Sequence, residues 1–288
     1  MTLLLQGLAL GLLTGGLYAL LAAGLSLYFG VMRVVMVAHP AFLFLAAYLT
    51  YSLHTGFGLD PLATMPITVP LFFGLGVLLQ RVIIRGLDPM MSVLLTFGLA
   101  LTVEGLLGTI YTGSYKSVSM DYATRSLSLG EVHLPYDKII AFWIAVITLT
   151  ALFALLVKSR FGRALRATVQ HPEAARLVGV RTERVAGYGF GVGLATAAVG
   201  GTVLALVTPF FPASHWAWIG KLMAIIVVGG LGSVLGAALA AILLGVVEGL
   251  VLVTVDATWA TLMFYAFLLV TLLLRPQGLF GGRLAHRF

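Results

Sequence analysis

The sequence has 288 residues, of which 60% are hydrophobic and only 9% are charged, whereas an average soluble domain has about 25% charged residues. Apolar runs of about 20 residues, the length that spans a membrane as a helix, follow one another along the chain. The composition therefore predicts an all-α fold, a polytopic transmembrane helical bundle in which residues 1–288 form a single domain. The net charge of +7 does not indicate a nucleic-acid partner, because the basic residues lie in short loops between the apolar runs.

The apolar runs predict nine helices. In chain order, their approximate ranges are 3–29, 41–53, 62–80, 90–111, 139–157, 185–207, 216–228, 234–254 and 259–274. The second run is too short to span a membrane unless the residues before Pro40 contribute to it. The glycine-rich break at residues 229–232 could be re-entrant, so we expect about eight to nine spanning segments.

Small residues mark two of these helices as closely packed. Gly7, Gly11 and Gly15 are four residues apart and form one stripe on the first helix, which lets another helix approach closely. We interpret this stripe as packing rather than function. The four glycines of residues 187–193 give the sixth helix two overlapping GxxxG spacings, and we expect it to be tightly packed as well.

The loop at residues 112–137 carries charges of both signs. Within it, the segment SLSLGEVHLP alternates apolar and polar residues, and Gly130 could turn the chain back on itself. This pattern is typical of a small β-hairpin.

The segment Lys158–Arg184 is the one long, strongly basic stretch of the chain. It carries seven of the 17 Lys and Arg residues, with only Glu173 and Glu183 against them. Its apolar positions recur at helical spacing and predict two short amphipathic helices at the membrane surface, the second of which Pro172 can begin and Gly179 can end. These apolar positions are Leu165, Val169, Ala174, Leu177 and Val178. Composition alone is equally typical of a solvated loop that faces lipid.

The basic residues also predict the orientation. If Lys158–Arg184 lies inside and the spans alternate, thirteen basic residues fall on the inside and four on the outside. Membrane proteins show this excess of Lys and Arg on the cytoplasmic side. The inside group consists of Arg33, Arg81, Arg85, the seven basic residues of the segment, Arg275, Arg283 and Arg287, and the outside group of Lys116, Arg125, Lys138 and Lys221. This places the N-terminus outside and the C-terminus inside.

No constellation for catalysis is present in the sequence. The six histidines are scattered without metal-ligand spacing, and the chain has no cysteine. There is no GxSxG, HExxH or GxxxxGK[ST] motif, so the chain has no P-loop with which to bind ATP. We therefore predict a protein that is not an enzyme and that needs no metal and no cofactor. If transport is driven by ATP, the ATPase is another polypeptide.

Ionisable side chains inside the predicted spans are few, namely Glu104 and Glu248. Each is costly in hydrocarbon and is expected to face the bundle interior or a wet path. Glu104 shares a helical face with Thr96 and Gly108 and could line a pathway or bond to a neighbouring helix. Glu248 lies between Gly245 and Gly249, where a structural role is favoured.

His39 is a further polar candidate, because it precedes Pro40 in a broken segment. Discontinuous helices of this kind form midplane sites in transporters. A lone histidine is as often a packed structural residue, so both interpretations stay open.

A resemblance to a known family emerges from four pieces of the chain. Glu173-Ala174-Ala175, followed after three residues by Gly179, resembles the EAA---G signature of ABC-importer permeases, and the run at 162–180 resembles those of branched-chain amino acid importers. The other pieces are the first helix through Tyr18-Ala19-Leu20, the stretch RVVMVAHPAF at 33–42 and RPQGLF at 275–280. One departure bears on specificity: the family usually has Asn-Phe-Ala-His-Gly where this chain has Met36-Val37-Ala38-His39-Pro40.

The resemblance implies a membrane permease subunit of an ABC importer for branched-chain amino acids or similar small polar solutes, in a bacterial cytoplasmic (inner) membrane. Its implied partners are a second similar permease or a second copy, two ABC ATPase subunits and an extracytoplasmic solute-binding protein that docks on residues 112–137 and 209–220. The alternative is an ion- or proton-coupled secondary transporter, although such a carrier usually needs more intramembrane charges and no basic EAA-like loop.

The resemblance also implies two sets of site residues. The loop of the EAA---G signature docks into the ATPase in that superfamily, and the implied coupling residues here are Arg163, Arg166, Pro172, Glu173, Ala174, Ala175, Leu177 and Gly179. The candidate translocation pathway consists of His39, Thr96, Glu104 and Glu248.

Overall fold

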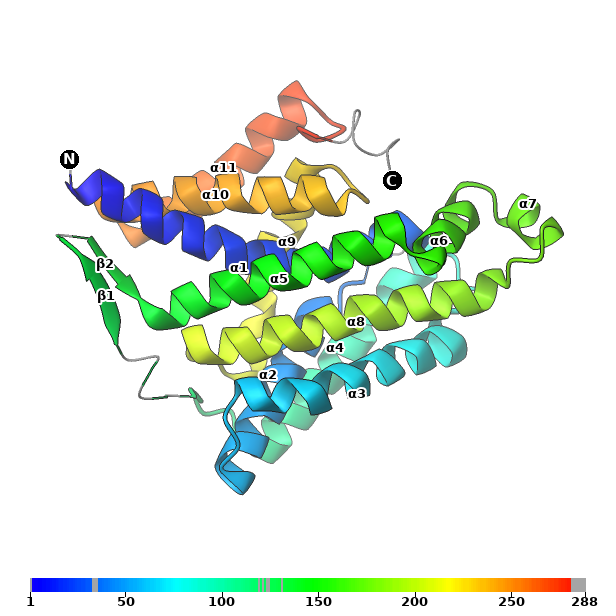
Figure 1. Ribbon diagram of the computed structural model, residues 1–288, viewed down its shortest axis with the longest axis horizontal. Helices are drawn as coiled ribbons and strands as arrows, with labels where there is room; N and C mark the ends of the chain where they lie inside the picture. The colour runs from blue at the N-terminus through cyan, green and yellow to red at the C-terminus, as the bar shows by residue number, and fades with distance from the viewer. Residues whose placement is uncertain are drawn as a thin grey trace.

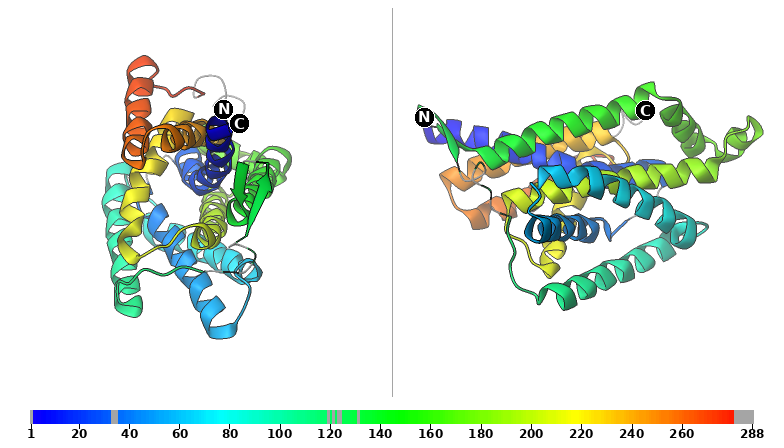
Figure 2. Two further views of the ribbon diagram at one scale, coloured as in Figure 1. Left: turned by 90° about the vertical axis from the view of Figure 1, so that its left-hand side faces the viewer. Right: turned by 60° about the horizontal axis from the view of Figure 1, so that its bottom comes forward.

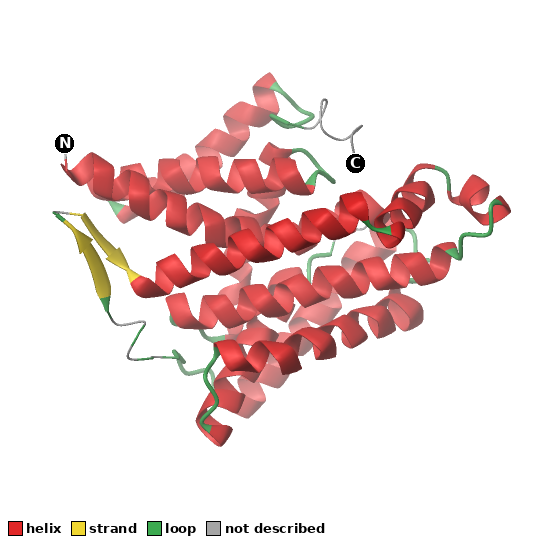
Figure 3. Cartoon of the chain, in the orientation of Figure 1, coloured by secondary structure: helices red, strands yellow, loops and turns green. Residues whose placement is uncertain are grey.

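A computed structural model describes residues 2–32, 36–118, 120, 122, 125–130 and 132–280. The chain is helical apart from one hairpin, as Figure 3 shows. The helices are α1 (Thr2–Met32), α2 (His39–Phe57), α3 (Met65–Leu79), α4 (Pro89–Tyr111), α5 (Tyr136–Lys158), α6 (Arg160–Gln170), α7 (Pro172–Leu177), α8 (Thr182–Val207), α9 (His215–Gly229), α10 (Val234–Thr254) and α11 (Ala257–Leu274). Short 3₁₀ turns occur at Leu62–Thr64 and Pro212–Ser214, and a π-helical turn at Gln80–Ile84.

Six helical segments are long and apolar enough to cross a membrane within the described residues. They are Thr2–Gly30, Leu62–Ile84, Met90–Tyr111, Tyr136–Lys158, Thr182–Val207 and Val234–Thr254. The all-α, polytopic membrane fold predicted from composition is confirmed. The helices α2, α9 and α11 fall outside this set, so the expected eight to nine spans are not reached by length and hydropathy alone.

The second apolar run makes a longer helix than its hydrophobic core of 41–53 predicts. It begins at His39 and ends at Phe57, with Pro40 in its first turn, where the missing amide hydrogen costs no helical bond. Gly58 ends it in the left-handed conformation, with φ of +66°. Only His39 of the residues before Pro40 joins the helix, and α2 reaches 19 residues mainly by extending to Phe57 at its other end.

The glycine stripe of α1 packs against α10. A Cβ atom added at Gly11 would lie 2.7 Å from the carbonyl oxygen of Gly245, and one added at Gly15 would lie 2.7 Å from Cα of Ile242. The two backbones are thus in direct contact, which only small residues permit. The interpretation of this stripe as packing is confirmed.

The glycines of α8 have the same role against α3 and the core. A Cβ atom at Gly191 would lie 2.8 Å from the carbonyl oxygen of Phe73, and Gly193 lies against the ring of Tyr28. Because α1 packs on α10 and α8 packs on α3, helices from the two halves of the sequence pack against each other. The tight packing predicted for this helix is confirmed.

Loops assigned to the same side by charge lie at the same end of the molecule. The Arg85 guanidinium forms a 2.7 Å ion pair with Glu183 at the start of α8. At the other end, Gln6 Nε2 donates to the carbonyl of His133, and Lys116 pairs through its backbone with Phe210. Figure 1 shows the N-terminus and the hairpin at the left end of the bundle and α6 and α7 at the right end.

The predicted hairpin is present at the end of the molecule that carries the N-terminus. Strands β1 (Ser126–Leu129) and β2 (Val132–Pro135) pair antiparallel with Ser126 opposite Pro135, and Gly130 turns between them with φ of +66°. Nearby, burial and the Asp60 carboxylate raise the pKa of Tyr122 to about 12. The Tyr122 hydroxyl donates to Asp60 at 3.4 Å, which ties this loop to the segment after α2.

The glycine-rich break separates α9 from α10 by a tight turn. Gly230 and Gly232 have φ of +92° and +85°, a backbone region that favours glycine. A Cβ atom at Gly229 would lie 2.6 Å from Cα of Ala237, so the two helix ends are in contact. Figure 2 gives two further views of how the helices are arranged.

Candidate functional site

The basic segment forms the two short helices that its periodicity predicts. Ser159 begins α6, and its Oγ accepts a hydrogen bond from the amide of Gly162 at 2.9 Å. Gly162 lies against the backbone carbonyl of Leu156, where a Cβ atom would overlap it. Leu165 is only 2% exposed, so α6 packs against the end of the bundle. Helix α7 projects beyond it (Figure 1).

Two arginines of α6 bond to the last turns of α5. Arg166 Nη1 donates to the carbonyl oxygen of Leu156 at 2.7 Å, and Arg163 Nη1 donates to that of Lys158 at 3.4 Å. Cations at a helix C-terminus satisfy its free carbonyls and favour its dipole. These two predicted coupling residues therefore also fasten α6 to the membrane-spanning part of the chain.

The second helix, α7, begins and ends where the sequence predicts. Pro172 is its first residue, and Glu173 and Ala174 are exposed beside it. Gly179 has φ of +84°. Its amide donates to Arg176 O at 3.0 Å, and the amide of Val180 donates to Ala175 O at 3.0 Å. This pair of bonds is the Schellman motif, in which glycine ends a helix sharply.

The apolar residues of this segment differ in burial. Ala175 is only 3% exposed and packs against its own chain, whereas Leu177 and Val178 are 89% and 79% exposed. The periodicity predicts an apolar face that includes Ala174, Leu177 and Val178 but not Ala175, and Ala174 is exposed as well. The structure instead places Leu177 and Val178 on the projecting tip, where no described residue covers them.

The predicted pathway residues His39 and Thr96 lie at the break between α1 and α2. His39 is fully buried, its Nε2 donates to the carbonyl of Leu21 at 3.0 Å, and its ring meets that of Tyr28 edge to face. Thr96 Oγ1, on α4, accepts a 3.3 Å bond from the amide of Val37. Both side chains hold the break in place, and their role in a pathway stays a prediction.

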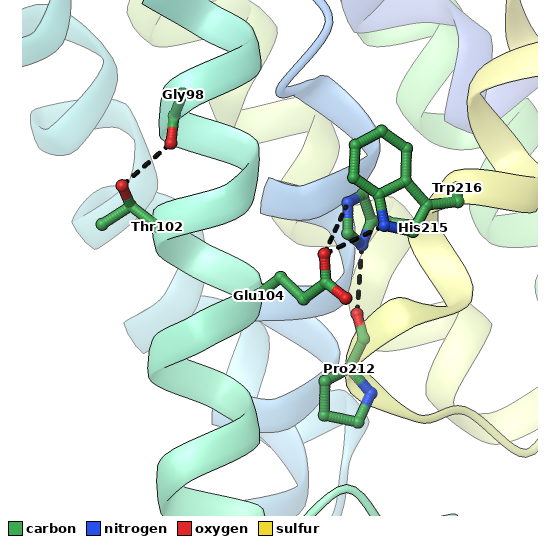
Figure 4. Close-up of polar contacts among 6 residues, drawn as sticks. All are labelled: Gly98, Thr102, Glu104, Pro212, His215 and Trp216. Carbon is green, nitrogen blue, oxygen red and sulfur yellow. Dashed lines mark hydrogen bonds and ion pairs between the residues drawn. The ribbon is translucent and has the colours of Figure 1, made fainter.

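Glu104 reaches from α4 toward the start of α9. Its Oε2 accepts a hydrogen bond from Trp216 Nε1 at 2.9 Å and lies 3.8 Å from Nε2 of His215. Figure 4 shows this convergence, with Thr102 pointing away from it on the other side of α4. The Glu104 side chain is 27% exposed and lines an open groove of about 490 Å³. The groove is formed by Leu101, Glu104, Gly105, Gly108, Gly113, Phe211, Pro212 and Ala213.

Glu248 lies inside the bundle and is paired. Its Oε1 is 2.8 Å from Nζ of Lys221, and the side chains are 10% and 22% exposed. Lys221 also donates to the hydroxyl of Tyr18 at 3.2 Å and lies over the rings of Tyr18, Trp218 and Phe264. Such contacts between an ammonium and aromatic rings are attractive. The structure therefore places Glu248 away from Glu104, in an environment of its own.

Sequence reasoning missed three residues of these sites. The charge count places Lys221 in the outside group, whereas the structure places it in the second turn of α9, where it pairs with Glu248. A lone lysine in one apolar run and a lone glutamate in another do signal a pair, because either charge alone is costly in hydrocarbon. The remaining two, His215 and Trp216, contact Glu104 from over a hundred positions away, and no local pattern marks them.

No group of three or more potential ligands could hold a metal ion among the residues that the structure describes. The prediction of no metal and no cofactor stays a prediction.

Comparisons with known proteins connect this architecture with transport. The family described as the permease component of branched-chain amino acid transport systems matches residues 7–273. The chain is 25% identical to the high-affinity branched-chain amino acid transport system permease protein BraD of Pseudomonas aeruginosa and 26% identical to the corresponding protein LivH of Escherichia coli. Each alignment covers 96% of this chain and 95% of the relative.

Two further relatives are also described as permease proteins, and one of them is matched over less than half of its length. A probable branched-chain amino acid transport permease protein of Methanocaldococcus jannaschii is 23% identical over 92% of this chain and 89% of the relative. An autoinducer 2 import system permease protein of Photorhabdus laumondii is 33% identical over 49% of this chain and 43% of the relative. No solved structure matches the chain significantly.

Proposed function

Because the chain belongs to the family of permease components of branched-chain amino acid transport systems, we propose that it imports branched-chain amino acids or similar small polar solutes as the membrane subunit of an ATP-driven transporter. The observation that carries this proposal is the match over residues 7–273, together with relatives aligned along nearly their whole length. The chain is a multi-pass permease of the cytoplasmic membrane. These relatives favour the importer over a secondary transporter that works alone.

The partners follow from the proposed function. The sequence contains no P-loop, so ATP hydrolysis belongs to two ATPase subunits in separate chains. A second similar permease, or a second copy of this one, completes the path, and an extracytoplasmic binding protein delivers the solute. The backbone pairing of Lys116 with Phe210 brings the two loops proposed to receive it together at one end.

We infer nine crossings with the N-terminus outside. In this assignment α2, α9 and α11 cross the membrane as well as the six long helical segments, and α6 and α7 lie in the cytoplasm. The arrangement of the connecting segments at two ends supports it, because the Arg85–Glu183 pair and the Gln6–His133 contact each join segments of one predicted side. The basic charge of the α6–α7 end supports the same orientation.

The projecting helix α7 is the proposed coupling element. Glu173, Ala174 and Leu177 are exposed on it, and α6 transmits its movement to α5 through the bonds of Arg163 and Arg166. Leu177 and Val178 give α7 an exposed apolar tip, and exposed apolar surface of this kind favours docking into a groove of a partner such as an ATPase. Ala175 is buried against its own chain, so it holds α7 in position and does not contact the partner.

Coupling is tested at the end of α7. Gly179→Leu places a branched side chain at φ of +84° and should distort the tip, because bulky residues disfavour that conformation. Gly58→Leu is a matched control, since Gly58 also ends a helix with positive φ in open space, but at the opposite end of the molecule. Co-purification of the ATPase and stimulation of ATP hydrolysis by loaded binding protein are measured for both.

We expect Gly179→Leu to lose ATPase recovery and stimulation by at least about tenfold, while Gly58→Leu keeps ATPase recovery. Ala174→Trp, an exposed change on the same helix, should act like Gly179→Leu. Equal recovery and stimulation in wild type, Gly179→Leu and Ala174→Trp would show that the segment is only a membrane anchor.

A further inference from the structure

A small cavity, apart from the groove at Glu104, lies beside the basic helix α6. It has a volume of about 90 Å³ and is bordered by α1, α5, α6 and the start of α10. Two spans, Thr2–Gly30 and Tyr136–Lys158, end at this cavity, and the span Val234–Thr254 begins there. The cavity therefore lies at the boundary between the hydrocarbon of a membrane and its headgroup layer, at the end of the molecule from which α7 projects (Figure 1).

The walls of this cavity are apolar. Every lining residue except Arg166 and Gln170 is apolar. The volume would hold several water molecules, but apolar walls give them no hydrogen bonds, and such cavities accept apolar occupants instead. Phe153 is 37% exposed and Gln170 is exposed as well, so the cavity reaches the outer surface of the bundle. It therefore suits a hydrocarbon chain that enters from the surrounding lipid.

Helix α6 places a row of cations along the edge of the cavity. Arg160, Arg163 and Arg166 are three residues apart and are therefore neighbours on one side of the helix. Arg166 lines the cavity itself. Arg163 Nη1 donates to the carbonyl oxygen of Lys158 at 3.4 Å, which brings the end of α5 next to the row. We call these four residues, Lys158, Arg160, Arg163 and Arg166, the basic row.

No acidic side chain neutralises the basic row. The sequence has no Asp or Glu between Asp137 and Glu173. Within the part of the chain that the structure describes, no member of the row forms an ion pair, whereas Arg85 at the same end is paired with Glu183. A cluster of four basic residues directly after a membrane span attracts anionic lipid headgroups. The row therefore suits an anion at headgroup depth.

We propose that the cavity and the basic row together bind one anionic glycerophospholipid. Its phosphate lies against Lys158, Arg160 and Arg163, and the upper part of one acyl chain occupies the apolar cavity. An amphiphile joins an anion to a hydrocarbon chain across such a boundary, which a free phosphate or an acidic partner protein does not. The inference does not rest on the proposed function, because the cavity shares no lining residue with the Glu104 groove or with α7.

The test uses the full purified chain, without an ATPase, in nanodiscs of equimolar phosphatidylglycerol and phosphatidylcholine with the same acyl chains. Native mass spectrometry measures the ratio of the two lipids that the protein retains. Lys158→Gln/Arg160→Gln removes two exposed charges that form no ion pair with a described residue, so the fold should be kept. Arg181→Gln/Arg184→Gln, at the start of α8, is the matched control with two exposed charges removed. Val169→Phe fills the cavity without a change of charge.

We expect wild type to retain phosphatidylglycerol preferentially. This enrichment should fall by about tenfold in Lys158→Gln/Arg160→Gln, fall in Val169→Phe and stay unchanged in the α8 control. An excess of soluble glycerol phosphate should not displace the lipid, because it lacks the chain. Where Val169→Phe does not fold, this displacement arm decides whether the chain is needed.

Four outcomes would overturn the proposal. Equal retention of both lipids by wild type would show that there is no such site, and an equal fall in the α8 control would leave only a general attraction of basic residues to anionic lipid. Displacement by glycerol phosphate would reveal a site for a soluble anion. Full enrichment in folded Val169→Phe would place the acyl chain outside the cavity.

Discussion

Glu104 and Glu248 are the two acidic side chains in the interiors of the predicted spans, and they lie in opposite environments on two faces of α9. Glu248 is paired at 2.8 Å with Lys221, whose ammonium lies over the ring of Tyr18. Glu104 bonds to the indole of Trp216, has only a histidine 3.8 Å away, and borders an open groove. One carboxylate is neutralised inside the protein, and the other is placed where it can meet solvent or solute.

The difference shows how a membrane bundle accommodates charge. A buried charge without a counterion is costly, so Glu248 requires Lys221. Glu104 reaches a groove, and its charge can be solvated there without a lysine. Because side chains of α9 contact both carboxylates, a movement of this one helix would change both environments together. Variants on each side of α9 therefore test whether the two carboxylates have different roles.

The largest expected effect follows from removing one member of the buried pair. Lys221→Leu leaves the Glu248 carboxylate without its counterion and should lower the free energy of unfolding by about 3 kcal/mol. The double variant Lys221→Leu/Glu248→Leu removes both charges and should recover most of that loss. The measurement is thermal or denaturant unfolding of the chain in detergent. A single variant as stable as wild type would mean that water, rather than Lys221, stabilises Glu248.

Much of the fold follows from local patterns in the sequence. The nine apolar runs correspond to α1–α5 and α8–α11. A long apolar stretch in a membrane has to satisfy its own backbone hydrogen bonds, and a helix does so. Gly130, Pro172 and Gly179 mark the hairpin and α7 correctly, since each relies on a backbone property of that residue alone. Bounds differ by a few residues at helix ends, as in α2, which gains two residues before 41 and four after 53.

The sites could not be predicted to the same extent, because they depend on contacts between distant helices. Lys221 meets Glu248 only because α9 folds back on α10 at the glycine turn. Trp216 meets Glu104 across 112 positions, and helical periodicity carries no information on such a pairing. Periodicity also cannot say whether an apolar face meets its own bundle or a partner, which is why Leu177 and Val178 are exposed against expectation.

The second effect concerns transport rather than folding. Glu104→Gln keeps the size of the side chain and removes its charge from the groove, so we expect about tenfold slower transport, equivalent to about 1.4 kcal/mol, with normal protein yield. Thr102→Val is the control, because Thr102 lies on the other side of α4 and bonds only to its own helix at Gly98. Uptake in reconstituted vesicles and recovery of folded protein are measured side by side. Parallel loss of both would assign Glu104 a structural role like that of Glu248.

The smallest effect tests whether Trp216 acts through Glu104. Trp216→Phe keeps an aromatic ring against Phe97 and His215 but removes the Nε1 donor. One hydrogen bond to a partly exposed carboxylate contributes about 1 kcal/mol, so we expect a few-fold slower transport, less than for Glu104→Gln. If the indole only orients this carboxylate, Trp216→Phe should change little further when it is added to Glu104→Gln, because the bond is already weakened. Transport rates of the wild type, both single variants and the double variant form the cycle. Fully independent effects would mean that Trp216 contacts the solute itself and that Glu104 is held by other groups.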